Sequence, residues 1–187
     1  MPFRTGAGAR FAQLALLGEC VFHADDAANL WGIGNENTLH TTLSRYVRAG
    51  LLYRVRHGLY ATKLLAALDP NLVGVKAIHG PAYVSCETVL FREGYLNQPS
   101  REITLVARVA KRFTIGTNQY RCRQLAPRYL MNDVGVETVH GVRIATLPRA
   151  IADMRYFYPK KYLDKTVPRA VESASLDIAR VIGYTTS

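Results

Sequence analysis

The sequence has few of the features that would place it among secreted, metal-binding or membrane proteins. It holds only 3 cysteines in 187 residues, and Cys20, Cys86 and Cys122 lie far apart. A disulfide framework or a zinc ribbon needs closely spaced cysteines, so we expect reduced thiols and a cytoplasmic location. No apolar run reaches transmembrane length, and residues 1–6 lack the apolar stretch of a signal peptide. We therefore expect no membrane partner.

Catalytic signatures are missing as well. The sequence contains no nucleophile elbow, no glycine-rich phosphate loop and no carboxylate cluster suited to a metal ion. The candidates for a nucleophile and its base would act only if folding brought them within hydrogen-bond reach. A cysteine at the start of an apolar helix is more often buried packing. We therefore expect a protein that is not an enzyme and that uses no metal or cofactor. These candidates are Ser85, Cys86 and Glu87, with His79 and His140.

Acidic residues are scarce relative to basic ones. The chain has 24 lysines and arginines against 14 aspartates and glutamates, and its formal net charge is +10. A chain this basic attracts polyanions, although solubility alone accounts for part of such a charge. The imbalance is strongest over residues 37–62, which contain Arg45, Arg48, Arg54 and Arg56 and no acidic residue. This stretch predicts a contact with nucleic acid.

Residues 37–62 also have the pattern of an amphipathic helix followed by a basic hairpin. Asn35 or Asn37 can cap the helix start, and Gly50 stands where a left-handed cap belongs. Apolar and basic residues then alternate, and His57–Gly58 makes the turn. This order is the second half of a winged helix-turn-helix, which places a helix in the major groove of DNA and a hairpin on the adjacent backbone. The apolar helix face consists of Leu39, Leu43, Tyr46 and Val47.

The polar side of this helix and the hairpin carry the candidate DNA-binding side chains. Short hydrogen-bonding residues come first and arginines later, which suits base contacts followed by phosphate contacts. The alternative is a solvated helix face beside an ordinary hairpin. The candidates are Asn37, Thr38, His40, Thr41, Ser44, Arg45, Arg48, Arg54, Arg56 and His57.

The segment before this helix predicts two further helices. Residues 9–17 place Phe11, Leu14 and Ala15 on one helical face, and residues 23–32 form a short second helix. Trp31 would either close the core or stack on a nucleic-acid base.

The rest of the chain has a different pattern, and a boundary at 69–71 predicts domains at 1–68 and 69–187. Residues 82–85 are either an extended segment or the entry to a helix, and Thr146 is expected to cap the last helix. The fold class is therefore expected to be α+β, with an N-terminal winged helix-turn-helix followed by a mixed α/β domain whose sheet is mainly antiparallel. The expected helices are 72–78, 86–93 and 147–158, and the expected strands are 102–107, 113–115, 120–125, 134–139 and 142–145.

A second group of basic residues lies between Arg101 and Arg128, where Glu102 is the only acidic residue. Tyr120 and Tyr129 lie among them. Four interpretations of this group are open. It could be a second DNA contact, an RNA-binding face with stacking tyrosines, a surface for an acidic partner, or a solvated basic face. The possible second basic surface consists of Arg108, Lys111, Arg112, Arg121 and Arg123, with a later group of Lys160, Lys161 and Lys165.

Four segments, in this order, carry a resemblance to a known family. They are 56–60 (RHGLY), 82–90 (AYVSCETVL), 103–106 (ITLV) and 141–153 (GVRIATLPRAIAD). They resemble the AbiEi-like antitoxins of type IV toxin–antitoxin (abortive infection) systems, which are also transcriptional regulators.

The resemblance implies an N-terminal domain that binds inverted repeats of double-stranded DNA in its own promoter and represses transcription. The protein would be a monomer or weak dimer that pairs on the DNA. The C-terminal domain would counteract a nucleotidyltransferase-type toxin, with or without direct contact. The alternative is an RNA-binding or nucleic-acid-processing protein that uses the winged helix for docking.

Overall fold

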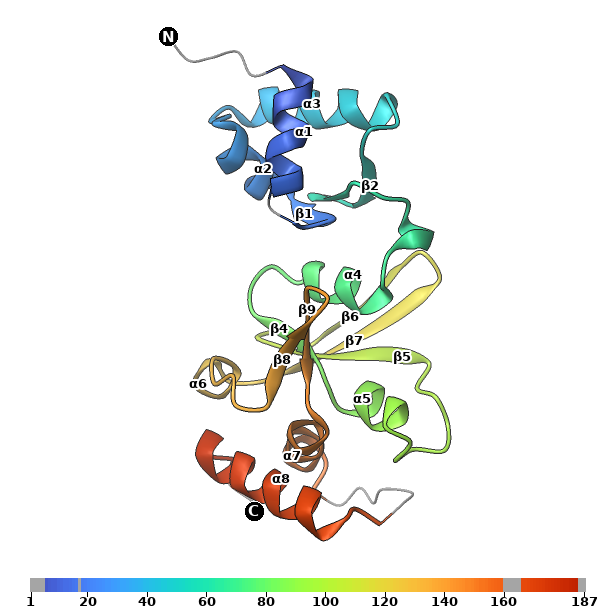
Figure 1. The fold of residues 1–187 in the computed structure, drawn as a ribbon, viewed down its shortest axis with the longest axis vertical. Helices are drawn as coiled ribbons and strands as arrows, with labels where there is room; N and C mark the ends of the chain where they lie inside the picture. The colour runs from blue at the N-terminus through green and yellow to red at the C-terminus, as the bar shows by residue number, and fades with distance from the viewer. Residues whose placement is uncertain (1–5, 17, 160–165, 185–187) are drawn as a thin grey trace. The chain divides into compact units, whose positions relative to one another are not determined.

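The computed structural model describes residues 6–16, 18–159 and 166–184. Its contacts divide the chain into two compact units, the first ending at Asp69 and the second beginning at Pro70 (Figure 1). Both units mix helices and strands, and most of the described strand pairs are antiparallel. The fold is therefore α+β with mainly antiparallel sheets. The end of the first expected helix, Leu17, and the later basic group of Lys160, Lys161 and Lys165 lie outside the described residues.

In the first unit, helices pack against a three-stranded sheet of order β1–β3–β2. The expected second helix begins one residue later than predicted, at Ala24, because Val21–His23 pairs with β3 as a strand that the sequence did not reveal. The helices are α1 (Ala7–Leu16), α2 (Ala24–Trp31) and α3 (Glu36–Arg48), and a 3-10 turn spans Leu65–Ala67. The strands are β1 (Val21–His23), β2 (Tyr53–Arg56) and β3 (Leu59–Ala61).

Trp31 lies in the core of this unit. Its side chain is 6% exposed. Its ring packs edge-on against the ring of Tyr46 of α3, with 5.9 Å between the two ring centres. The indole Nε1–H donates a hydrogen bond to the backbone oxygen of Arg10 at 3.2 Å. Trp31 is therefore a core residue and offers no free ring face for a base. Leu14 is buried with it, whereas Ala15 is exposed and not on the buried face as expected.

The second unit contains a six-stranded sheet of order β6–β7–β5–β4–β9–β8. Helix α4 covers one face of this sheet, and α5 and α7 lie against the other (Figure 1). Residues 82–84 form a strand, which resolves the two alternatives left by the sequence. The strands are β4 (Ala82–Val84), β5 (Glu102–Ala107), β6 (Lys111–Ile115), β7 (Asn118–Gln124), β8 (Val136–Val139) and β9 (Val142–Ala145). The helices are α4 (Pro70–Lys76), α5 (Glu87–Arg92), α6 (Pro127–Leu130), α7 (Leu147–Phe157) and α8 (Arg169–Ile182).

The side chains of β7 alternate between the two faces of the sheet, as strand geometry requires. Tyr120 points toward α4, where its hydroxyl donates to the backbone oxygen of Pro70 at 2.9 Å. A Cβ atom on Gly74 of α4 would lie 2.5 Å from Cε1 of Tyr120, so the helix and the sheet meet closely there. Arg121 and Arg123 point to the opposite face, toward α7 and α5.

A buried polar network joins α7 to the sheet and to the end of α8. The Arg149 and Asp153 side chains are both fully buried, and Arg149 Nε donates to Asp153 Oδ1 at 3.0 Å. Asp153 also accepts hydrogen bonds from the hydroxyls of Ser85 at 2.7 Å and Tyr184 at 2.6 Å. Burial, followed by the nearby Asp153 carboxylate, raises the pKa of both the Tyr83 and Tyr184 hydroxyls well above the usual range. These hydroxyls therefore stay protonated and act as donors.

Thr146 differs from the sequence expectation. It occupies the residue before α7, but its side chain does not cap the helix. Instead, its hydroxyl donates to the backbone oxygen of Gly135 at 3.2 Å, which fastens the segment before β8 to the helix start. Among the helices that the structure describes, none has the length and apolar character needed to cross a bilayer.

Candidate nucleic-acid interface

The start and end of α3 follow from two residues that flank it. Asn35 has extended backbone angles, and its Oδ1 atom accepts a hydrogen bond from the backbone N–H of Thr38 at 3.0 Å. This satisfies one of the free donors of the first turn, so Asn35 and not Asn37 is the cap. Gly50, just after the helix, has φ of 69°, as expected for a left-handed stop.

The polar face of α3 is open to solvent over the candidate DNA-binding residues. The opposite face is buried in the core, where Leu39 is 4%, Leu43 0% and Tyr46 3% exposed. The predicted periodicity is therefore confirmed, and it orients the polar side chains outward. The exposed candidates are Asn37, Thr38, Thr41, Ser44, Arg45 and Arg48, and His40 is half-buried.

The first turn of α3 contains a carboxylate that the sequence interpretation did not weigh. Glu36 belongs to the helix, and its Oε1 atom lies 3.4 Å from Nε2 of His40, one turn later. The Thr38 hydroxyl is likewise engaged, because it donates to Oδ1 of Asn35 at 3.3 Å. A carboxylate at a helix start is favoured by the helix dipole but repels phosphate. The polar side chains with the most freedom are therefore those of the middle and end of the helix.

The hairpin that follows presents two arginines on one face. Along β2, Tyr53 and Val55 are half-buried, whereas Arg54 and Arg56 are exposed. The pairing with β3 shifts register between Arg54 and Arg56, as in a β-bulge, a feature that bends a strand and re-aims its side chains. His57 is exposed at the turn beside Gly58, as the sequence predicted.

Three of these arginines have no carboxylate within ion-pair distance in the described part of the chain. They are Arg45, Arg48 and Arg54. The guanidinium of Arg45 lies 5.6 Å from the ring centre of Tyr46, which is itself anchored in the core. Helix and hairpin therefore display positive charge whose counter-ions come from solvent.

The residues of the possible second basic surface lie on both faces of the sheet, although four of the five, Lys111, Arg112, Arg121 and Arg123, line one cavity. Arg112, Arg121 and Arg123 lie on the sheet face that α5 and α7 cover, since Arg112 pairs with Arg121 across β6 and β7. Lys111 pairs with Cys122 and lies on the opposite face, where its Nζ is 5.3 Å from the ring of Phe113. Arg108 is exposed in the turn after β5.

Burial removes two further assumptions about that surface. Arg123 is 6% exposed and forms an ion pair with Glu87 of α5, so it is not a solvent-facing cation. Tyr120 is 1% and Tyr129 8% exposed. The idea of stacking tyrosines on an open sheet is therefore wrong, because both rings are packed inside the unit.

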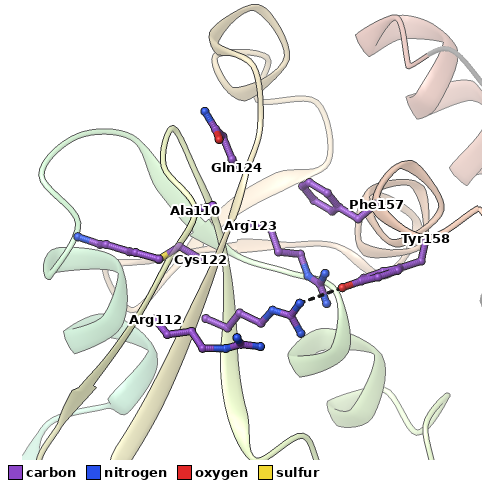
Figure 2. Close-up of a pocket in the computed structure, with 9 residues that line it drawn as sticks. Ala110, Arg112, Cys122, Arg123, Gln124, Phe157 and Tyr158 are labelled. Carbon is purple, nitrogen blue, oxygen red and sulfur yellow. Dashed lines mark hydrogen bonds between the residues drawn. The ribbon is translucent and has the colours of Figure 1, made fainter.

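The arginines of this face instead line a cavity of about 540 Å³. Figure 2 shows Arg112, Arg123, Phe157 and Tyr158 gathered on one side of the strands, with the sulfur of Cys122 on the other. Nη2 of Arg121 donates to the Tyr158 hydroxyl at 3.1 Å.

The chain matches no protein-family model and no curated protein. Among solved structures, it is similar to the crystal structure of the RV2827C protein from Mycobacterium tuberculosis, with a TM-score of 0.46 and 12% sequence identity. The match covers 78% of this chain and 58% of that one, so the chain spans less than two thirds of that protein's length.

Among the residues considered for catalysis, Ser85 and Cys86 belong to the core of the second unit. Ser85 and Cys86 are fully buried, and burial raises the pKa of the Cys86 thiol well above its usual range. That thiol is therefore protonated and a poor nucleophile. His79 and His140 are both exposed, His140 at the β8–β9 turn. Within the described residues, no group of three or more histidines, cysteines or acidic residues is placed to hold a metal ion.

Three residues escaped the sequence interpretation, one on α3 of the first unit and two beside the cavity of the second. Glu36 stands one residue before the acid-free stretch, so a longer window would have included it. Phe157 and Tyr158 lie at the end of α7 and reach Arg121 and Arg123 only through folding. The adjacent aromatic residues were visible in the sequence, but the strand that they would face was not.

Proposed function

We propose that the first unit is a winged helix-turn-helix that binds double-stranded DNA, with α3 as the recognition helix and the β2–β3 hairpin as the wing. The observation that carries this proposal is the exposed, polar face of α3 with arginines at its end that no carboxylate of the described residues balances. Charge of this kind binds phosphate, and a helix with a rigid, buried opposite face can present side chains to the major groove.

The individual roles follow from position along α3 and β2. Thr41, Ser44 and Arg45 would face the base edges, where an arginine can bond two acceptors of guanine. Arg48 and Arg54 would contact phosphates beside the groove. One such unit covers a short half-site, so two copies of the chain would pair on an inverted repeat.

We further propose that the protein represses its own promoter and serves as the antitoxin of a type IV toxin–antitoxin system, opposing a nucleotidyltransferase-type toxin. The support for this step is the resemblance of the segments 56–60, 82–90, 103–106 and 141–153 to AbiEi-like antitoxins. The antitoxin role is assigned to the second unit.

The test of DNA binding is a titration of the full chain on its own upstream DNA and on a scrambled duplex of the same length and composition. The proposal expects tighter binding to the upstream duplex at near-physiological salt and in the absence of divalent metal. Equal, steeply salt-dependent binding to both duplexes would reduce the first unit to a non-specific polycation.

The antitoxin step has its own test. If a nucleotidyltransferase-type toxin is encoded beside the chain, co-expression of the two should restore growth of cells that the toxin arrests. If the chain binds its operator but does not restore growth, the proposed repressor function stands and the proposed antitoxin function is overturned.

A further inference from the structure

The cavity beside β7 carries an excess of positive charge on its walls. Arg121 has no carboxylate partner in the part of the chain that the structure describes, and its Nη2 donates to the Tyr158 hydroxyl. The other two guanidinium groups are each balanced by a glutamate. The cavity therefore keeps the charge of Arg121 available for an anion. The balanced pairs are Arg112 with Glu102 and Arg123 with Glu87.

Arg123 lines the same cavity, but its guanidinium is enclosed by its neighbours. Its side chain is only 6% exposed, and its Nη2 is held by Glu87. The ring of Tyr158 lies 4.4 Å from its guanidinium carbon. The Nε atom is buried and has no hydrogen-bond partner. Arg123 therefore supports the wall of the cavity, and Arg121 is the lining arginine whose charge no carboxylate of the described residues balances.

The size and the remaining walls of the cavity limit what fits it. Sites for small organic ligands have volumes of about 300–1,000 Å³, and the cavity measures about 540 Å³. A phosphate group alone would leave most of that space empty. Phe157 and Tyr158, both half-buried, provide an aromatic wall beside the guanidinium groups. Aromatic rings next to arginines suit a planar base that is joined to a phosphate.

We propose that this cavity binds a nucleoside 5′-phosphate. The phosphate oxygens accept hydrogen bonds from Arg121, and the base packs against Phe157 and Tyr158. The same chemistry is available from a free nucleotide and from the 5′-terminal nucleotide of a nucleic-acid strand. This site lies wholly within the second unit, and it does not depend on the proposed DNA binding of the first.

The test is isothermal titration calorimetry of the full chain with AMP, adenosine and inorganic phosphate. The proposal expects saturable binding of AMP, with adenosine and inorganic phosphate each weaker by at least about tenfold. Inorganic phosphate that binds as tightly as AMP would overturn the proposal, because the cavity would then be an anion site only. Adenosine that binds as tightly as AMP would overturn it too, since the arginines would play no part. Absence of AMP binding at millimolar concentration would also overturn it.

Two variants that each remove one positive charge make the test specific. Arg121→Gln should weaken AMP binding by at least about tenfold, because it removes the charge that no carboxylate balances. Arg108→Gln is the matched control, since Arg108 is exposed in the turn between β5 and β6 and does not line the cavity. It should bind AMP like the parent protein. Equal loss in both variants would show that only net charge matters. Urea unfolding of both variants checks that the second unit remains folded.

The two sources of the ligand are separated by a 5′-phosphorylated RNA tetranucleotide. Tighter binding of the tetranucleotide than of AMP, lost in Arg121→Gln, would assign the site to a strand end, and the reverse order would assign it to the free nucleotide. Arg45→Ala, which is expected to impair operator binding, should leave AMP binding unchanged. The proposals of operator binding and of nucleotide binding can therefore be overturned separately.

Discussion

Asp153 accepts a hydrogen bond from Arg149 Nε at 3.0 Å, and the two side chains, one turn apart on α7, are both fully buried. The remaining donors around Asp153 are hydroxyls from β4, the residue after β4 and the segment after α8. The pair is therefore the point at which sheet, helix and C-terminal segment meet in the second unit.

We expect Asp153→Asn to destabilise the second unit by about 3–5 kcal/mol, because the buried Arg149 guanidinium would lose its counter-charge. Urea unfolding followed by circular dichroism measures this loss. Asp177→Asn is the control, since the Asp177–Arg180 pair on α8 is 62% and 81% exposed and such pairs contribute about 0–1 kcal/mol. Unfolding of both variants at the same urea concentration would contradict the assignment.

Gly135→Ala should destabilise the second unit more than Gly141→Ala. Both glycines have positive φ, 73° and 80°, so each substitution carries backbone strain of about 1–2 kcal/mol. A Cβ atom on Gly135 would also lie 2.8 Å from Cβ of Arg149, whereas nothing lies within 4 Å of one on Gly141. Thermal unfolding of the two variants measures the difference. Equal losses would show that the backbone near Gly135 moves to relieve the contact.

Arg45→Ala should weaken binding to the upstream duplex by about 1–3 kcal/mol and relax the preference at one base pair. The reason is the loss of a bidentate contact from the exposed face of α3. Competition binding with duplexes substituted one base pair at a time measures both effects. Arg92→Ala removes an exposed charge from α5 of the second unit and serves as control. Unchanged base preference in Arg45→Ala would place the recognition surface elsewhere.

Arg54→Ala should weaken specific and scrambled duplexes alike. An arginine that contacts phosphate adds to affinity without reading sequence, so its loss should lower the slope of log affinity against log salt by about one. Filter binding over a series of salt concentrations gives that slope for both proteins. A change in base preference, with the slope intact, would instead place Arg54 in contact with bases.

The thiols should differ sharply in reactivity. Burial raises the pKa of the Cys86 thiol well above its usual range and that of the Cys122 thiol to about 11. Both thiols are therefore protonated at about pH 8. Cys20 is half-buried. At about pH 8, a disulfide reagent that attacks thiolates should therefore modify Cys20 alone in the folded protein and all three thiols in urea. Cys20→Ser should abolish the rapid reaction of the folded protein with the reagent. A rapid reaction that persists would show that a buried thiol is accessible.

Local patterns allowed α3 and its surroundings to be predicted from the sequence. The spacing of Leu39, Leu43 and Tyr46 placed the buried face correctly, because a helical repeat depends only on neighbouring residues. The turns at Gly50 and Gly58 were foreseen for the same reason, since each requires a positive φ. The exposed positions of the candidate DNA-binding residues, apart from the half-buried His40, followed from these features.

Features that depend on distant partners were not predictable in this way. Val21–His23 becomes a strand only because β3 lies beside it. Arg123 is buried because Glu87, far away in sequence, supplies its counter-charge. Lys111 and Arg112 point to opposite faces of the sheet because side chains alternate along a strand, and pairing with β7 starts β6 two residues before the predicted strand 113–115. Charge density in the sequence therefore overstated how much basic surface the second unit presents.

The burial of Trp31 has a practical consequence for spectroscopy. It is the only tryptophan of the chain, and it lies in the first unit, edge-on to a tyrosine of α3. Emission excited selectively at the red edge of indole absorption therefore reports on the first unit alone. The protein carries its own optical probe for one half of the molecule, and the unfolding of that half can be followed without attaching a dye.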